Sequence, residues 1–265
     1  MNVKELENYL KIDKKNFDVP TLEALNYYTE HFMLTVPFEN IDVQNKMRIS
    51  VEIKDIFDKI VRQNRGGYCY ELNPLFQSYL KEKGFDARIV SATIHTPGGG
   101  RSQPGSHVSL VVCIDGIDYV TDVGFGDLPI NVIPITTIEN SQVIGNKSGR
   151  FRAIFQNEQC DSFFVQKWED NHWSTKYEAS LEGKRIQDFA ENIEYNQTNP
   201  NSIFVKRLVV TMSKPYGRVT MPQNYLTITK GEKKEKMEIS TQNYRTILKK
   251  YFNIDVIVQR LETNH

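Results

Sequence analysis

A cysteine, a histidine and an aspartate occupy positions from which they could act together on a substrate. Cys69 lies in the stretch NRGGYCYELNPLF, after Gly66, Gly67 and an aromatic residue, where a helix-like pattern begins. A free thiol with a pKa near ~8.5 is mostly protonated at neutral pH, and a helix N-terminus or a neighbouring imidazolium lowers that value. The two glycines would allow a tight turn and leave room for a substrate. The position therefore suits a nucleophile.

Taken alone, Cys69 also fits an ordinary buried thiol, because most free cysteines behave as small hydrophobes. Cys113 and Cys160 lie in or beside strand patterns without a catalytic cue, and they are interpreted in that way. Pro74, five residues after Cys69, removes one helical hydrogen bond. We therefore expect the first turn to be kinked or the helix to begin slightly later.

Residues 107–126, HVSLVVCIDGIDYVTDVGFG, give the strongest hairpin signal, with two β-branched runs around Asp115-Gly116. A two-residue turn at 115 and 116 makes the numbers of paired residues sum to 231. Because side chains alternate across a sheet, His107 and Asp122 then share one face as diagonal neighbours, roughly 7–8 Å apart between backbones. The opposite face is apolar and is expected to be core; its members are Val108, Leu110, Val112, Ile114, Ile117, Tyr119 and Val123.

These positions would allow Cys69, His107 and Asp122 to act as nucleophile, base and orienter. An aspartate on one ring nitrogen fixes the tautomer of the histidine, and the other nitrogen can take a proton from the thiol. The alternative for His107 and Asp122 is a surface pair on a half-exposed hairpin. His95 is a rival base, but no carboxylate shares its predicted register. No His, Cys and Asp cluster has the spacing of metal ligands, so the sequence predicts no metal site.

The elements that must position these residues change in type along the chain. Apolar periodicity predicts helices over 21–33, 51–61, 69–83 and 243–252. Strands are predicted over 87–94, 107–123, 151–155, 163–168, 173–178, 207–212, 217–221 and 225–229. Residues 191–202 are interpreted as a break. Helices, then strands, then a mixed tail indicate an α+β arrangement in three parts.

Composition limits the classes of function. The 265 residues are 39% hydrophobic and 25% charged, which is ordinary for a globular protein. The 33 basic and 33 acidic residues give no net charge, so nucleic acid is not indicated as a partner. No apolar run suits a signal peptide or the ~18 residues of a membrane span. Three cysteines do not make a disulfide framework, and we expect a cytoplasmic protein with reduced thiols and no membrane partner.

Four segments, in order, resemble the signature segments of the arylamine N-acetyltransferase family. They are VPFENID at 36–42, RGGYCYELN at 65–73, SHVSLVV at 106–112 and TDVGFGD at 121–127. The resemblance implies a helical domain over 1–84 with the nucleophile, a β-barrel domain over 85–195 with the histidine and aspartate, and an α/β lid over 196–265. It is weaker after about residue 183, and Tyr68 stands where many members carry tryptophan.

The resemblance also implies roles for individual residues. Cys69 would accept the acetyl group, His107 would be its base, and Asp122 would orient the base. Glu39 and Arg65 resemble a charged pair that supports the site; otherwise they are an unrelated surface pair. The residues implied in substrate binding are Phe38, Ser106 and Phe125, and those implied in coenzyme binding are Gly124, Gly126 and Lys214.

Basic residues near the C-terminus could neutralise the phosphates of a coenzyme, or they could form a solvated basic face. These residues are Lys206, Arg207, Lys214 and Arg218.

The activity implied is transfer of an acetyl group from acetyl-CoA to an aromatic amine or hydrazine, as in xenobiotic metabolism. An acetyl-cysteine intermediate would give ping-pong kinetics. Three alternatives stay open from the sequence. One is an amide synthase of the same family that uses a carrier-bound acyl thioester. Another is a cysteine hydrolase similar to papain or transglutaminase, and the last is a binding protein with an inactive site.

Overall fold

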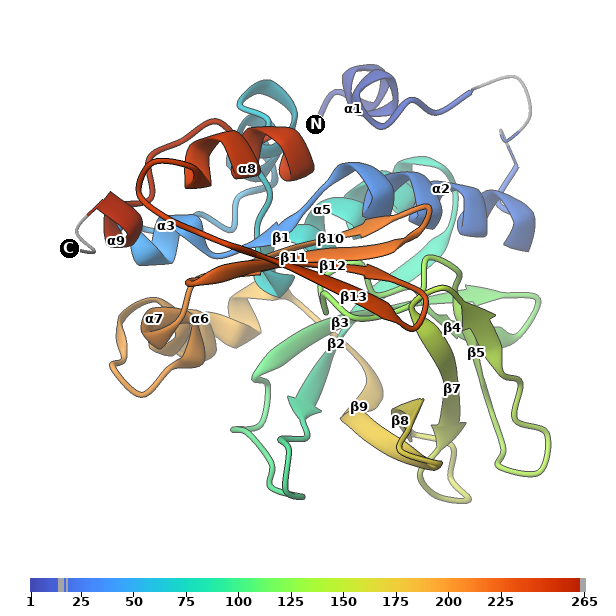
Figure 1. Cartoon of the computed structure of the whole chain (residues 1–265). Helices are drawn as coiled ribbons and strands as arrows, with labels where there is room; N and C mark the ends of the chain where they lie inside the picture. The colour runs from blue at the N-terminus through green and yellow to red at the C-terminus, as the bar shows by residue number, and fades with distance from the viewer. Residues whose placement is uncertain (14–16, 18, 263–265) are drawn as a thin grey trace.

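The computed structural model describes residues 1–13, 17 and 19–262. Helices fill its first third, a closed barrel follows, and an α/β region with a second sheet ends the chain (Figure 1). This arrangement confirms the predicted α+β fold class. No helix in the described part of the chain is long and apolar enough to cross a membrane.

The N-terminal helices follow the local signals in the sequence. The first elements are α1 (Val3–Leu10), α2 (Leu22–Thr35), β1 (Phe38–Glu39), α3 (Ile41–Gln44), α4 (Ile53–Phe57), the π-helix η1 (Asp58–Arg62) and α5 (Cys69–Glu82). Thr21 begins α2, since its hydroxyl accepts the N–H of Ala24 at 3.2 Å. Gly84, with φ +86°, follows the end of α5. The helix predicted over 51–61 is present from residue 53, but its second half is π-wound.

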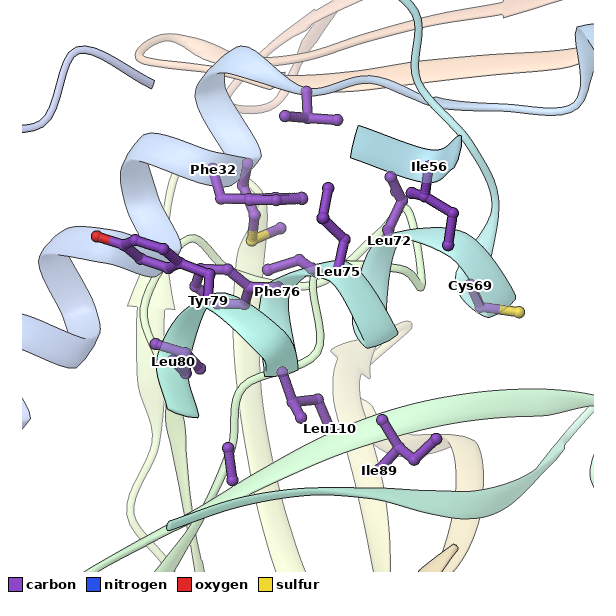
Figure 2. Close-up of a cluster of buried hydrophobic side chains, with 14 of the residues drawn as sticks. Phe32, Ile56, Cys69, Leu72, Leu75, Phe76, Tyr79, Leu80, Ile89 and Leu110 are labelled. Atoms are coloured by element: carbon purple, nitrogen blue, oxygen red, sulfur yellow. The ribbon is translucent and has the colours of Figure 1, made fainter. Parts of the chain in front are cut away.

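The apolar face of α5 forms the centre of the helical core. The side chains that the helical spacing predicts to be inside are fully buried: Leu72, Leu75, Phe76, Tyr79 and Leu80. They pack with Phe32 of α2, Ile56 of α4 and Leu110 of the barrel (Figure 2). Residues 69–76 of α5 are all buried, and this burial fixes the first two turns of the helix and with them the place of its first residue.

Seven strands close the barrel. Its strands are β2 (Asp86–Ile94), β3 (His107–Ile114), β4 (Ile117–Val120), β5 (Ile133–Thr136), β7 (Gly149–Phe155), β8 (Ser162–Glu169) and β9 (His172–Lys184), with β6 (Ile144–Asn146) added beside β7. The order is β5-β4-β3-β2-β9-β8-β7, and parallel pairing of β5 with β7 closes it. The sequence patterns did not predict β5 and β6.

The β3–β4 hairpin has the predicted register over its paired residues, but the strand predicted through residue 123 ends at Val120, so Asp122 lies in the loop after β4 and not opposite Ser109. Val111 faces Val120 and Ile114 faces Ile117, so the pair sums are 231. Asp115 and Gly116 both have positive φ, 50° and 78°, as a two-residue hairpin turn requires. Ile117 is 45% exposed and not in the core, because it lies beside the turn at the tip of the hairpin.

The hairpin is buried on both faces, which corrects the expectation of a half-exposed one. Val108, Leu110 and Val112 belong to the helical core, whereas Val111 and Val120 belong to a second core inside the barrel. Closure of the barrel turns the predicted polar face toward the interior, so chemistry on this face occurs away from bulk water.

The C-terminal part adds a second sheet. The elements after the barrel are η2 (Ile186–Phe189), α6 (Ala190–Thr198), α7 (Ile203–Lys206), β10 (Val209–Lys214), β11 (Gly217–Pro222), β12 (Tyr225–Lys230), β13 (Lys233–Glu238), α8 (Tyr244–Phe252) and α9 (Gln259–Glu262). Strand β1 pairs with β10 at one edge of this sheet, and α8 lies on one side of it with the barrel on the other (Figure 1).

The interpretation of residues 191–202 as a break is wrong, because α6 extends through Thr198. Ile193 and Asn196, three residues apart, are its buried positions. A helix held by so few apolar contacts gives a weak periodic signal in the sequence.

Candidate active site

Cys69 is the first residue of α5 and opens onto a cavity. Its side chain is 2% exposed, and it lines a cavity of about 660 Å³. The sulfur points away from the apolar cluster behind the helix (Figure 2). The first hydrogen bonds of α5 run from the N–H groups of Glu71 and Leu72 to the carbonyl of Tyr68, at 2.9 and 3.0 Å. Cys69 therefore stands at the start of the helix, as predicted.

The helix keeps this start despite Pro74, which lies inside α5. The option of a later start is therefore excluded. The proline removes only the hydrogen bond to the carbonyl of Tyr70, one turn earlier, and the surrounding core retains the helix.

His107 and Asp122 are a buried, hydrogen-bonded pair. The imidazole Nε2 lies 2.6 Å from Asp122 Oδ2, and each residue is 3% exposed. Burial lowers the pKa of His107, but the charge of Asp122 and hydrogen bonds with Asp122 and the Cys69 thiol outweigh it, and the pKa rises to about 10. Because Nε2 is held by Asp122, Nδ1 is the nitrogen left for the thiol. The structure thus brings together all three residues that the sequence proposed for catalysis.

The other carboxylate oxygen of Asp122, Oδ1, accepts hydrogen bonds from two further groups. Asn73 Nδ2 donates to Asp122 Oδ1 at 2.8 Å, and the N–H of Gly124 donates to the same oxygen at 2.9 Å. Burial raises the pKa of Asp122, but the His107 charge and these hydrogen bonds outweigh it, so the pKa is lowered. Asp122 is therefore the charged partner in this pair. Asn73 comes from the second turn of α5, which ties the nucleophile's helix directly to the orienting carboxylate.

Tyr177 is a residue of this site that the sequence did not reveal. Its hydroxyl donates to Asp122 Oδ2 at 3.0 Å and lies 2.9 Å from the hydroxyl of Ser109, which must then be the donor. Tyr177 is on β9 and faces Ile94 of β2. The sequence predicted only a strand at this position. No local sequence pattern shows that β9 packs beside residues so much earlier in the chain.

Replacing Tyr177 by phenylalanine is expected to reduce the rate of the chemical step by less than about tenfold and the free energy of unfolding by about 1–3 kcal/mol. The substitution removes one donor to Asp122, whereas His107, Asn73 and Gly124 remain. Single-turnover kinetics and chemical denaturation would measure both effects. Tyr225→Phe, at a tyrosine that is 40% exposed, is the control. A loss as large as that from removing the Asp122 charge would contradict this supporting role.

The glycines of the signature segments serve close packing. A Cβ at Gly124 would lie 2.8 Å from Cys69 Cα, so only glycine lets this loop approach the start of α5. A Cβ at Gly66 would lie 1.9 Å from the Pro37 carbonyl oxygen, and one at Gly67 would lie 2.7 Å from Glu71 Oε2. The expectation that Gly66 and Gly67 leave room for a substrate is therefore corrected, since protein atoms fill that space.

Glu39 and Arg65 form a buried ion pair, which excludes the alternative of an unrelated surface pair. Arg65 Nε donates to Glu39 Oε1 at 2.9 Å, and Arg65 also contacts Asp42 Oδ1 at 2.7 Å. Glu39 is 1% and Arg65 6% exposed. The pair joins the segment after α2 to the segment before α5.

The residues expected to bind substrate line the cavity at Cys69. Phe38, Ser106 and Phe125 all border it, as does Gly124. The Phe125 ring lies 5.4 Å from the His107 ring, measured between centroids, with the two rings close to perpendicular. Phe38 and Phe125 therefore present apolar walls beside the nucleophile.

A second cavity, of about 400 Å³, shares the walls made by Phe38 and Phe125. It lies between the barrel and the C-terminal sheet, and its further lining includes Gly126, Lys167, Arg218, Thr229 and Lys234. Asp127 also lines this cavity and pairs with Lys167 at 2.7 Å and with Arg218 at 3.5 Å. With Lys234, the two cations exceed this one carboxylate, so the cavity could accept an anionic group.

The basic residues singled out in the sequence lie in different places. Arg218 is 9% exposed and donates to the carbonyls of Gly126 and Leu128. Lys214 lines neither cavity; its Nζ lies 3.2 Å from the sulfur of Met212. Lys206 and Arg207 are both exposed.

His95 has a carboxylate partner, contrary to the sequence-based expectation. Its Nε2 lies 3.2 Å from Glu178 Oε2, and Arg101 Nε lies 3.0 Å from the other oxygen of Glu178. Glu178 comes from β9, opposite Thr93, so local register could not predict it. His107 nevertheless is the histidine in contact with the thiol. Among the residues that the structure describes, no group of three or more His, Cys, Asp or Glu side chains could hold a metal ion.

Comparisons with known proteins agree with this geometry. An N-acetyltransferase family model matches residues 21–261. Human arylamine N-acetyltransferase 1 is 27% identical over 266 aligned residues, which cover 92% of this chain and 91% of the human protein. The structure is similar to that of arylamine N-acetyltransferase C from Bacillus anthracis, with a TM-score of 0.85, 25% identity, and coverage of 96% of this chain and 99% of that one.

A similar fold is also found in an arylamine N-acetyltransferase from Bacillus cereus with a Cys-His-Glu catalytic triad. The TM-score is 0.85 at 24% identity, over 97% of this chain and 100% of that one. In the present chain it is an aspartate, Asp122, that contacts the histidine. The family model spans nearly the whole chain, and the chain therefore belongs to the arylamine N-acetyltransferase family.

Proposed function

We propose that this enzyme transfers an acetyl group from acetyl-CoA to an aromatic amine or hydrazine, through an acetyl thioester of Cys69. One observation carries the proposal: Cys69, at a helix start, shares a cavity wall with His107, which interacts with the thiol and whose Nε2 is held by the buried Asp122. Family membership and the names of the relatives support acetyl as the group and an arylamine as the acceptor. A cytoplasmic location would agree with this chemistry, because it keeps the thiol reduced.

In the first step the Cys69 thiolate attacks the carbonyl carbon of acetyl-CoA. The C–S bond between the acetyl group and coenzyme A then breaks. The coenzyme sulfur leaves with the proton that His107 took from Cys69, and acetyl-Cys69 remains. In the second step the amine nitrogen attacks acetyl-Cys69, His107 accepts the amine proton, and the C–S bond to the enzyme breaks. Conversion of a thioester to an amide lowers the free energy, so the second step drives the overall reaction.

Backbone N–H groups at the start of α5 would stabilise the oxyanion of both steps. The N–H groups of Cys69 and Tyr70 come before the first hydrogen bonds of the helix, which begin with the N–H of Glu71. They carry the positive end of the helix dipole. Donors fixed in this way bind developing negative charge without having to reorganise.

The two cavities would provide separate binding sites for the aromatic acceptor and for the coenzyme. Phe38, Ser106 and Phe125 would hold a flat aromatic acceptor in the cavity at Cys69. The coenzyme would reach the sulfur past Gly124 and Gly126, with its anionic part in the cavity between the barrel and the C-terminal sheet. Lys167 and Lys234 line that cavity, whereas Lys214 does not, so Lys214 is left out of the proposal.

Intact mass after mixing with acetyl-CoA tests the proposal. We expect the protein to gain one acetyl group, and to lose it when an arylamine is added with formation of the amide. Protein pretreated with iodoacetamide should gain none. Absence of the acetyl group would contradict the proposal. Cleavage of a peptide p-nitroanilide without coenzyme A would then favour a hydrolase, and acylation by a carrier-bound thioester would favour an amide synthase.

A further inference from the structure

Five charged side chains are buried together beside the start of α5, and none of them has a role in the mechanism above. The members of this charge cluster are Glu39, Asp42, Lys59, Arg65 and Glu71. Side-chain exposure ranges from 0% for Glu39 to 13% for Lys59. Three carboxylates face two cations, so the cluster has an excess of one negative charge when all members are ionised. Buried charge of this kind acts over longer distances than surface charge, because water screens it poorly.

Glu71 connects the charge cluster to the peptide next to the nucleophile. Its Oε2 accepts the N–H of Tyr68 at 3.1 Å, which closes a cap on the first turn of α5. Its Oε1 accepts a hydrogen bond from Lys59 Nζ at 2.8 Å. Gly67 leaves the space that this carboxylate occupies, as the close approach of a Cβ there shows. Glu71 thus stands two residues from Cys69 with its charge fixed in place.

Lys59 is held in position by an unusual turn of the backbone. It lies in the π-helix η1, and its carbonyl accepts the N–H of Arg65 at 3.2 Å. Its Nζ lies 2.7 Å from Asp42 Oδ2 and 2.8 Å from Glu71 Oε1. π-Helical turns are rare and often occur at functional sites. Lys59 is therefore the cation that bridges Glu71 to the rest of the charge cluster.

We propose that Lys59 is a positioning residue that acts through Glu71: it fixes the first turn of α5 and balances the charge of the carboxylate that accepts the peptide N–H just before Cys69. The inference rests on the assignment of Cys69 as nucleophile in the proposed function. Without Lys59, Glu71 would lose its cation and the cluster would carry two excess negative charges at the start of the nucleophile's helix, which would oppose ionisation of the sulfur. Without the charge of Glu71, the charge cluster would be neutral and ionisation would be favoured.

Other titratable groups also lie around the Cys69 thiol, and a substitution that tests the role of Lys59 must leave them unchanged. From the barrel, His107 and, behind it, Asp122 face the sulfur; from the start of α5 itself, Tyr68, Tyr70 and Glu71 are the titratable neighbours. Burial raises the pKa of Glu71 above its ordinary value, and the Lys59 charge opposes this rise. Burial lowers the pKa of Lys59, but the charges of Glu71, Glu39 and Asp42 outweigh it and raise the pKa. The two groups therefore depend on each other for their ionised forms.

The test is the rate of alkylation of Cys69 by iodoacetamide as a function of pH, with the modified peptide identified by mass spectrometry. We expect Lys59→Met to move the midpoint of the rate profile to higher pH by roughly half a unit or more, and Glu71→Gln to move it to lower pH. The double variant Lys59→Met with Glu71→Gln should return close to the wild-type midpoint. Lys54→Met, at an exposed lysine paired with Asp58, is the matched control and should not move it.

The opposite signs separate this inference from a purely structural role. Loss of the cap alone would lower thermal stability in both variants and would leave the midpoint unchanged, or would move it the same way in both. Either result would overturn the proposal. If Lys59→Met does not fold, the direction found for Glu71→Gln decides. Alkylation needs no acetyl-CoA, so a failure to acetylate the wild-type protein would count against the proposed function and not against this inference.

Discussion

Replacing Cys69 by alanine is expected to reduce acetyl transfer by at least about 10⁴-fold, to the level of the uncatalysed reaction. In the proposed mechanism the sulfur forms the bond to the acetyl group, so the covalent intermediate cannot form without it. Neither the acetylated protein in intact mass spectra nor the amide product should be detectable. Steady-state turnover with acetyl-CoA and an arylamine measures the loss.

The fold of the Cys69→Ala variant should be retained, because alanine is compatible with a helix start and removes a single atom from the packing. Circular dichroism and the unfolding midpoint would check this. Cys160→Ala is the control, since Cys160 is exposed and outside the cavities. Turnover retained in the Cys69 variant with a native fold would show that the acyl group is not carried on this sulfur.

Replacing Asp122 by asparagine is expected to lower the rate of acetylation by about 10³–10⁴-fold. Asp122 Oδ1 accepts from Asn73 and Gly124, so the amide oxygen of the substituted side chain would take that place and its NH₂ would face His107 Nε2. The imidazole would then have to accept at Nε2 and carry its proton on Nδ1, where it cannot take one from Cys69. Single-turnover acetylation followed by mass spectrometry measures this change.

The same substitution should change how stability depends on pH. The pKa of His107 is raised from 6.5 to about 10, so the stabilisation from its charged form is complete below pH 6.5 and is lost as the pH rises through 10. The pKa of Asp122 is lowered from 3.8, so its contribution is complete above pH 3.8 and is lost at lower pH. The difference in unfolding free energy between wild type and Asp122→Asn should be largest between these limits and should shrink toward pH 10.

Asp118→Asn is the matched control for both measurements. Asp118 lies on β4 of the same hairpin and pairs with Arg88 at 2.7 Å, away from the cavities. Its loss can lower stability but should leave the acetylation rate unchanged. Equal losses of rate in the two variants would mean that Asp122 acts only by holding the fold together.

Local sequence patterns determined much of the site, although the residues of the site lie far apart along the chain. The turn at Asp115-Gly116 sets the register of its own hairpin, so the loop that follows β4 at Val120 runs back along β3 and brings Asp122 to His107. The apolar spacing after Cys69 sets the face and the start of α5. Each of these depends on backbone preferences and alternation over a few residues, which a single sequence displays. The signature segments then identified the chemistry, although no spacing alone could separate a transferase from a hydrolase.

Only the tertiary structure determined which distant residues complete the site. Tyr177 and Glu178 lie on β9, and the register of β9 against β2 includes an irregularity between Val90 and Ala92. Barrel closure through β5 and β7 places both faces of the hairpin inside. Lys59 reaches Glu71 through a π-helical turn. Pairing between segments far apart in the chain is selected by the packing of the whole core, because many registers are equally compatible with the local pattern. For that reason the sequence identified the reacting groups. The fold determined which distant residues hold these groups in position and influence their ionisation.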